Sequence, residues 1–128
     1  MAIPILVVDD SAMSRKLVIK ALPPEWEVEV HQAGNGQEAL NLYKSSKAQV
    51  ILLDLTMPVM DGFEVLESLK RDGLTPFVIV ISADVQPKAQ ERVKELGAAA
   101  FLKKPIKTDE ITQVLMGFLR NKPIPCKR

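Results

Sequence analysis

The sequence predicts a single α/β domain, built as a doubly wound, five-stranded parallel sheet. Short apolar runs rich in β-branched residues alternate with amphipathic stretches along the 128 residues. Runs of this kind are typical of strands buried on both faces, because helices cover both sides of a parallel sheet. The length suits one domain with a full hydrophobic core. We therefore expect five consecutive βα units joined by right-handed crossovers.

Five apolar runs are expected to form the strands. They cover residues 3–8, 27–32, 49–53, 77–81 and 99–102. In the second run Glu27, Glu29 and His31 alternate with valines, which is the pattern of a half-exposed edge strand. We therefore place this run at the edge of the sheet. In a doubly wound sheet the third run should be central.

The gaps between the runs carry helix start and stop signals. Ser11 is the expected cap of a helix that ends near Leu22, where two prolines stop it. The other helices are expected over about 37–43 after Asn35-Gly36, from Asp61-Gly62 to Asp72-Gly73, over 86–96, and from just after Thr108 to about Arg120. Residues 1–120 should form the domain. Residues 121–128, with two prolines, should form a short tail or the start of a linker.

Composition excludes several classes of protein. Apolar residues make up 47% and charged residues 26%, and the net charge is only +1, so no global field attracts nucleic acid or acidic membranes. The single cysteine, Cys126, favours a reducing compartment. No apolar run approaches the roughly 20 residues that span a bilayer. We expect a cytoplasmic protein without a membrane anchor or direct contact with nucleic acid.

Charged side chains follow three of the predicted strands. Asp9 and Asp10 follow the first run, Asp54 follows the third, and Lys104 follows the fifth, directly before Pro105. If these runs are parallel neighbours, the charges converge on one edge of the sheet. Three carboxylates so close need a compensating cation, hydrogen-bond donors or solvent. Oxygen ligands without histidine or cysteine indicate Mg²⁺, or Mn²⁺, rather than zinc. Capping of the following helices is the structural alternative.

Several motifs occur together in a characteristic order. They are Leu-Val-Val-Asp9-Asp10-Ser11, Leu-Leu-Asp54-Leu-Thr-Met57-Pro58 with Met60-Asp61-Gly62, Ile81-Ser82-Ala83, and Lys104-Pro105. In this order they resemble the receiver domain of bacterial response regulators, of the single-domain CheY-like type in length. The resemblance covers nearly the whole chain. It implies a flavodoxin-like, CheY-like (βα)5 fold and a role in two-component phosphorelay signalling.

The resemblance also implies a role for each matched residue. Asp54 would be the phosphoacceptor, because an aspartate oxygen can attack phosphorus to form an aspartyl phosphate. Asp10, Asp54 and the backbone carbonyl of Thr56 would bind Mg²⁺ directly, with Asp9 acting through a water. Lys104 would pair with a phosphoryl oxygen, or with Asp54 before phosphorylation.

Two further positions resemble the switch residues of the family. The hydroxyl of Ser82 would bind a phosphoryl oxygen, and the ring of Phe101 would turn inward, although ordinary core packing remains open for Phe101. The Lys104-Pro105 bond is expected to be cis, with trans as the alternative. Thr56 and Asp84 sit where the family tunes the phosphoryl lifetime. We expect His31 on the edge strand to face solvent.

The leading hypothesis is a binding switch. A histidine kinase or phosphotransfer protein would dock near Met13, Ser14 and Arg15. An effector protein or a fused output domain would read the fourth helix, fifth strand and fifth helix, and the chain would be a monomer or a phosphorylation-dependent dimer. Exposed candidates for the output contact are Lys88, Arg92, Glu95 and Glu110. Two alternatives are a phosphatase or phosphotransferase for small substrates and a receiver-shaped scaffold that is never phosphorylated.

Overall fold

A computed structural model describes residues 3–24, 26–46, 48–55, 60–83, 86–104 and 106–121. Within these residues, five strands alternate with five helices in the predicted order. The strands are β1 (Ile3–Val8), β2 (Val28–Ala33), β3 (Val50–Leu53), β4 (Phe77–Ser82) and β5 (Ala100–Lys103). The helices are α1 (Ala12–Ala21), α2 (Gly36–Ser46), α3 (Gly62–Arg71), α4 (Pro87–Glu95) and α5 (Thr108–Asn121).

Most boundaries lie within one residue of the prediction, and the larger difference is at the end of α2. This helix continues three residues past the predicted end at 43. The last helix begins at Thr108 itself, one residue earlier than expected. Helix boundaries are the least certain part of such predictions, because helix ends fray and their exact positions differ by one or two residues.

All neighbouring strands pair in parallel, in the order β2-β1-β3-β4-β5. The weakly apolar β2 is therefore an edge strand, as its alternating pattern predicts. The third strand is central, and each of its four residues is buried. Both placements and the doubly wound fold class are confirmed.

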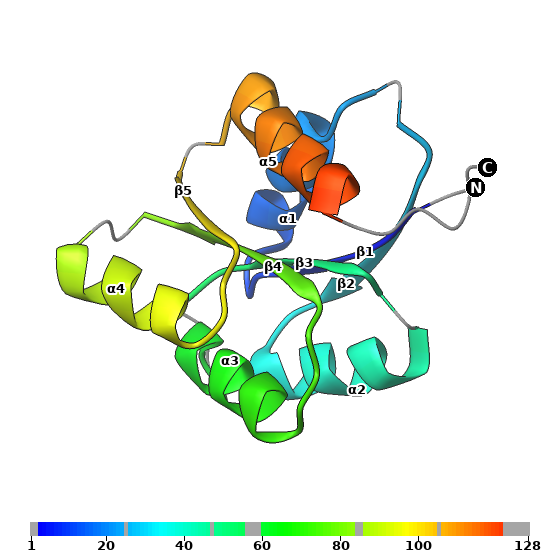
Figure 1. Cartoon of the computed structure of the whole chain (residues 1–128). Helices are drawn as coiled ribbons and strands as arrows, with labels where there is room; N and C mark the ends of the chain where they lie inside the picture. Colours follow the sequence, from blue (N-terminus) through cyan, green and yellow to red (C-terminus); the bar gives the residue numbers. More distant parts are fainter. Residues whose placement is uncertain are drawn as a thin grey trace.

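Two layers of helices cover the sheet. Helices α1 and α5 lie on one face, and α2, α3 and α4 lie on the other (Figure 1). Side chains alternate between these faces along a strand. Ile5 and Val7 of β1 belong to the core under α1 and α5, whereas Leu6 and Val8 belong to the core under the other three helices. The continuous apolar runs in the sequence follow from this two-sided burial.

Helix α3 is tied directly to the end of β3. The backbone N–H of Gly62 donates to the carbonyl oxygen of Leu55 at 3.0 Å. A β-carbon on Gly62 would lie 2.5 Å from the carbonyl oxygen of Asp54, which leaves no room for a side chain. Glycine at this position therefore allows the helix to start against the backbone that carries Asp54.

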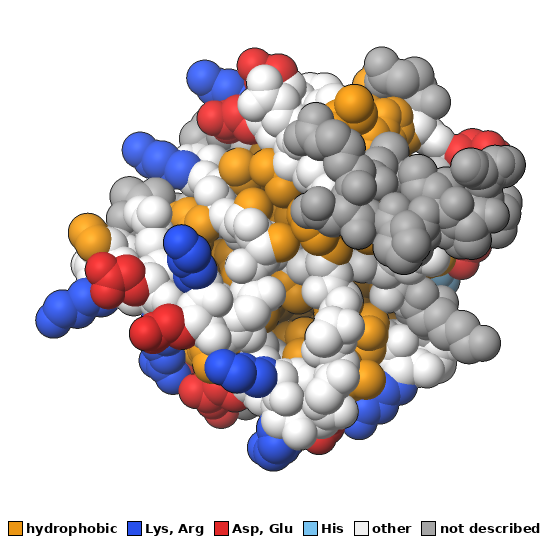
Figure 2. Space-filling view, in the orientation of Figure 1, with side chains coloured by type: hydrophobic (Ala, Val, Ile, Leu, Met, Phe, Trp, Pro, Cys, Tyr) orange, Lys and Arg blue, Asp and Glu red, His pale blue; other side chains and the backbone are white. Residues whose placement is uncertain are grey.

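The amino ends of the strands carry a groove of about 690 Å³. Its lining includes the rings of Tyr43, Phe77 and Phe118, and the last two pack with centroids 5.2 Å apart. Figure 2 shows hydrophobic side chains gathered in the hollow below α5. This groove lies at the opposite edge from Asp9, Asp10 and Asp54. No helix in the described part of the chain is both long and apolar enough to cross a membrane.

Candidate active site at the carboxyl edge of the sheet

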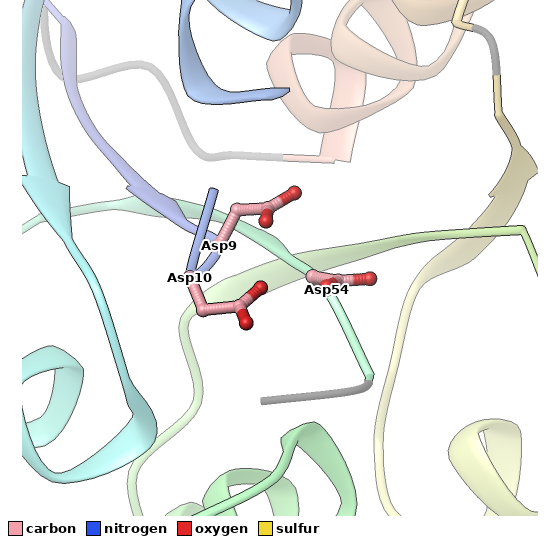
Figure 3. Close-up of side chains that lie close together, drawn as sticks. All are labelled: Asp9, Asp10 and Asp54. Carbon is pink, nitrogen blue, oxygen red and sulfur yellow. The ribbon is translucent and has the colours of Figure 1, made fainter. Parts of the chain in front are cut away.

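Three aspartates meet where β1 and β3 end. The two strands are neighbours, with Val8 opposite Leu53, so the residues that follow them are brought together. One carboxylate oxygen from each of Asp9, Asp10 and Asp54 lies within 4.8 Å of the other two. Figure 3 shows the three side chains pointing to the same side, two from the end of β1 and one from the end of β3. The convergence expected from the sequence is present.

The two residues of the acidic pair have different surroundings. The side chain of Asp9 is buried, and its Oδ1 accepts a hydrogen bond from the backbone N–H of Ser11 at 2.9 Å. The side chain of Asp10 is exposed to solvent. Asp9 is therefore fixed by the protein, whereas Asp10 is open to solvent while its carboxylate belongs to the same cluster.

Lys104 contacts two of the three carboxylates. Its Nζ lies 2.9 Å from Oδ2 of Asp9 and 3.5 Å from Oδ1 of Asp54. The expected pairing with Asp54 is thus the longer of the two contacts. The backbone N–H of Lys104 also donates to the carbonyl oxygen of Ser82 at 3.0 Å, which ties the lysine to the end of β4.

The site carries more negative than positive charge. Burial raises the pKa of the Asp54 carboxyl above its ordinary value; the Lys104 ammonium opposes this shift and the charge of Asp9 adds to it. Burial lowers the pKa of Lys104, but its hydrogen bond to Asp9 and the charges of Asp54 and Asp9 outweigh this, so its pKa is raised. Lys104 therefore stays protonated, while ionisation of Asp54 is favoured by an added cation.

The donor set fits a hard divalent cation. Three carboxylates face one ammonium group, and their oxygen atoms are close enough to share one ion. Magnesium prefers oxygen ligands, keeps several waters and usually takes one or two carboxylates. Of the four expected ligands, Asp9, Asp10 and Asp54 are brought together, and Thr56 lies outside the described residues.

The remaining predicted positions are distributed around the site. Ser82 ends β4 and is 2% exposed, and Phe101 of β5 is partly buried against the core under α2, α3 and α4. Asp84 and Pro105 lie outside the described residues, so the predicted cis bond is not tested. His31 lies on the edge strand β2, and its Nε2 is 2.8 Å from Oε2 of Glu29. It does not belong to the acidic cluster.

Two contacts to the site were not predicted. Nη1 of Arg15 donates to the carbonyl oxygen of Asp9 at 2.6 Å, and Nζ of Lys104 lies 3.5 Å from Oγ of Ser14. Arg15 and Ser14 lie in the first turns of α1, which we expected only to form a docking surface for the phosphoryl donor. Their position directly after the acidic pair is a usable signal, because side chains there can reach back to the strand end.

Comparison with known proteins agrees with the motifs and the fold. The family model described as the response regulator receiver domain matches residues 5–116. A protein-glutamate methylesterase/protein-glutamine glutaminase of Syntrophomonas wolfei is 38% identical over 104 residues, which are 79% of this chain and 29% of that protein. The chain thus spans less than a third of this curated relative.

Two solved structures cover nearly the whole chain. The signal receiver domain of the putative response regulator NarL from Mycobacterium tuberculosis has a TM-score of 0.85 and 32% identity, covering 94% of this chain and 98% of that one. The CheX-CheY-BeF3-Mg complex from Borrelia burgdorferi has a TM-score of 0.81 and 29% identity, covering 91% and 88%. This chain therefore belongs to the family of response regulator receiver domains, the phosphoacceptor modules of two-component signal transduction.

Proposed function

We propose that Asp54 accepts a phosphoryl group from a histidine kinase or phosphotransfer protein, and that its phosphorylation changes the affinity of one surface for a partner. The observation that carries this proposal is the setting of Asp54. Asp54 is 8% exposed at the end of the central strand, and its carboxylate lies beside two further carboxylates and the ammonium of Lys104. A buried carboxylate in such a site is suited to nucleophilic attack on a positioned phosphoryl group.

In the proposed step an Oδ of Asp54 attacks the phosphorus of the donor phosphohistidine. The new O–P bond forms as the P–N bond breaks, and the electron pair returns to the ring nitrogen of the donor. Asp10, Asp54 and the carbonyl of Thr56 would hold Mg²⁺, with Asp9 acting through a water. Bound there, the ion would neutralise charge on the phosphoryl oxygens.

Lys104 and Ser82 are proposed to hold the phosphoryl group once it is transferred. The ammonium of Lys104 is already 3.5 Å from Oδ1 of Asp54, so a short movement brings it to a phosphoryl oxygen. The hydroxyl of Ser82, at the end of the neighbouring strand, would donate to another. The partly buried ring of Phe101 would then turn inward, so that a local change in charge alters the surface around β5.

Two surfaces are proposed for the partners. The donor would dock near Met13, Ser14 and Arg15 of α1, a helix on which Met13 is 68% and Leu17 56% exposed. The output surface would comprise α4, β5 and α5. Its exposed candidates are Lys88, Arg92, Glu95 and Glu110. The reader would be an effector protein or a fused output domain.

The remaining proposals concern the protein as a whole. We propose a cytoplasmic regulator that phosphorylates and dephosphorylates itself but has no metabolic substrate. It would be a monomer or a phosphorylation-dependent dimer, and it would not contact nucleic acid directly. Residues 1–120 would form the receiver, with 121–128 as a tail or the start of a linker.

Intact mass after incubation with acetyl phosphate and Mg²⁺ tests the chemistry. We expect the mass of one added phosphoryl group, which is absent from the Asp54→Asn variant and from metal-free protein. An unchanged mass would mean either that the phosphoryl group is hydrolysed rapidly or that the protein is never phosphorylated. A stable beryllofluoride complex would favour rapid hydrolysis. Failure to bind beryllofluoride as well would contradict the proposal and favour an unphosphorylated scaffold.

A further inference from the structure

The side chain of Asp10 has little support of its own. Asp9 is buried and both of its carboxylate oxygens have hydrogen-bond donors, Ser11 and Lys104. Asp10 is exposed, and within the described residues no hydrogen bond or ion pair of its side chain is found. The contacts that the structure shows around Asp10 are those of its two flanking peptide groups.

Arg15 holds the peptide bond that leads into Asp10. Its Nη1 donates to the carbonyl oxygen of Asp9 at 2.6 Å. Because the peptide unit is planar, fixing this oxygen also fixes the plane that contains the nitrogen and Cα of Asp10. On the other side of Asp10, the N–H of Ser11 is held by Oδ1 of Asp9.

The guanidinium of Arg15 is itself fixed by a second strand. Its Nε donates to the side-chain Oε1 of Gln32, in the edge strand β2, at 2.9 Å. One planar group thus spans from α1 to two different strand ends. A lysine carries a single ammonium on a flexible stem and would not reproduce both hydrogen bonds in this geometry.

We propose that Arg15 is a positioning residue for the metal-binding carboxylates: it holds the Asp9–Asp10 peptide so that Asp10 faces the cluster before the ion arrives. This inference rests on the proposed function, since it concerns the same cation site. Arg15 does not touch the ion, and it acts through the backbone of Asp9. Residues that orient ligands in this way commonly change metal affinity about 10- to 100-fold when they are replaced.

The sign of the effect separates positioning from simple electrostatics. The positive charge of a guanidinium that contacts the backbone of Asp9 repels an incoming cation. If charge were its only influence, removing Arg15 would tighten metal binding. If Arg15 positions Asp10, removing it weakens binding despite the lost repulsion.

Direct titration of the metal-free protein with Mn²⁺, followed by the electron paramagnetic resonance signal of the free ion, measures the affinity without any reaction. We expect Arg15→Met to bind Mn²⁺ about tenfold more weakly than the native chain. Arg15→Lys should lie between them, and Gln32→Leu should weaken binding by a smaller factor. Lys16→Met removes a charge from the neighbouring exposed position of α1 and should bind at least as tightly as the native protein.

A kinetic readout uses the same variants with acetyl phosphate. We expect the metal concentration for half-maximal rate to rise in Arg15→Met, while the rate at saturating Mn²⁺ approaches that of the native chain. Equal or tighter Mn²⁺ binding by a folded Arg15→Met protein would overturn the inference. If that variant does not fold, Gln32→Leu decides, and unchanged affinity there would overturn it.

Mn²⁺ binding by the native chain and by Asp10→Asn shows whether a negative result overturns the role of Arg15 or the metal site of the proposed function. Native protein that binds no Mn²⁺, or binds it equally well without the carboxylate of Asp10, would contradict the metal site itself. Loss of binding in Asp10→Asn with full binding in Arg15→Met would leave the metal site intact and overturn only the role of Arg15.

Discussion

Helices α3 and α4 lie beside each other on the same face of the sheet, but they are fixed by different means. α3 buries Val65, Leu66 and Leu69 together with Gly62 and Ser68, whereas Val93 is the one buried residue of α4. Hydrophobic burial is the main source of stability for a surface helix. We therefore expect α3 to be held much more firmly than α4.

The amino-terminal end of α3 is also capped more fully than that of α4. At α3, Oδ1 of Asp61 accepts from the N–H of Glu64 at 2.9 Å, and Oε1 of Glu64 accepts from the N–H of Asp61 at 3.0 Å. This capping box satisfies two backbone donors. At α4 the side chain of Gln86 makes no capping hydrogen bond.

Exposed polar contacts join the two helices. Nη2 of Arg92 lies 2.9 Å from Oε2 of Glu67, and its guanidinium lies 4.5 Å from the centre of the Phe63 ring. Nζ of Lys70 donates to the carbonyl oxygen of Glu95 at 3.0 Å. Contacts of this kind are weak and readily exchanged with water. We therefore expect α3, next to Asp54, to open less readily than α4 of the proposed output surface, because it has more buried residues and a complete capping box.

The largest effect should come from the buried residues of the two helices. Leu66→Ala should lower the free energy of unfolding by about 3 kcal/mol, through lost burial and the cavity that remains. Val93→Ala removes less buried surface and should cost about 1 to 2 kcal/mol. Equilibrium denaturation in urea measures both values. Equal losses at the two sites would contradict the difference in anchoring.

The capping residues should have an intermediate effect. Asp61→Ala should cost about 1 kcal/mol, because the backbone N–H of Glu64 loses its capping oxygen and the reciprocal capping box is broken. Gln86→Asp places a carboxylate at the start of α4, where it can cap the helix and interact with its dipole. We expect slower amide hydrogen exchange in α4 for this variant. Unchanged amide exchange would show that the missing cap at the amino-terminal end does not limit the stability of α4.

The smallest effect is expected for Arg92→Ala. The exposed ion pair and the ring contact together should be worth at most about 1 kcal/mol. The free energy of global unfolding should therefore change little. Amide hydrogens of α4 should exchange a few-fold faster in the variant than in the native protein, while those of α3 keep their native rates. Lys94→Ala, an exposed lysine on the same helix, serves as the control. A similar acceleration in both variants would deny Arg92 a specific role.

Most of the fold follows from local pattern. The alternating charges around His31 predicted an edge strand, and the doubly wound fold class placed the run before Asp54 at the centre of the sheet; both placements are confirmed. Burial on two faces leaves a strong signal in each strand because nearly every position must be apolar. The end of α2 was less predictable, since no strong stop signal follows Tyr43.

The acidic cluster was equally predictable, because parallel strands bring their carboxyl ends to one edge of a sheet. The detailed contacts were not. Lys104 lies closer to Asp9 than to Asp54, and Arg15 reaches the carbonyl of Asp9. Arg92, expected to be available to an effector, is 54% exposed but already engaged with Glu67. Such contacts depend on how helices pack and on rotamers, and the sequence pattern does not encode either directly.

The ring contact between Phe77 and Phe118 determines where the chain leaves the domain. It holds α5 at Phe118 against the amino ends of the strands, at the opposite edge of the sheet from Asp54. The chain therefore leaves the described fold at Asn121 remote from the chemistry. Under the proposed function, a module attached beyond that point would receive its signal through the body of the domain rather than by direct contact with the phosphoryl group.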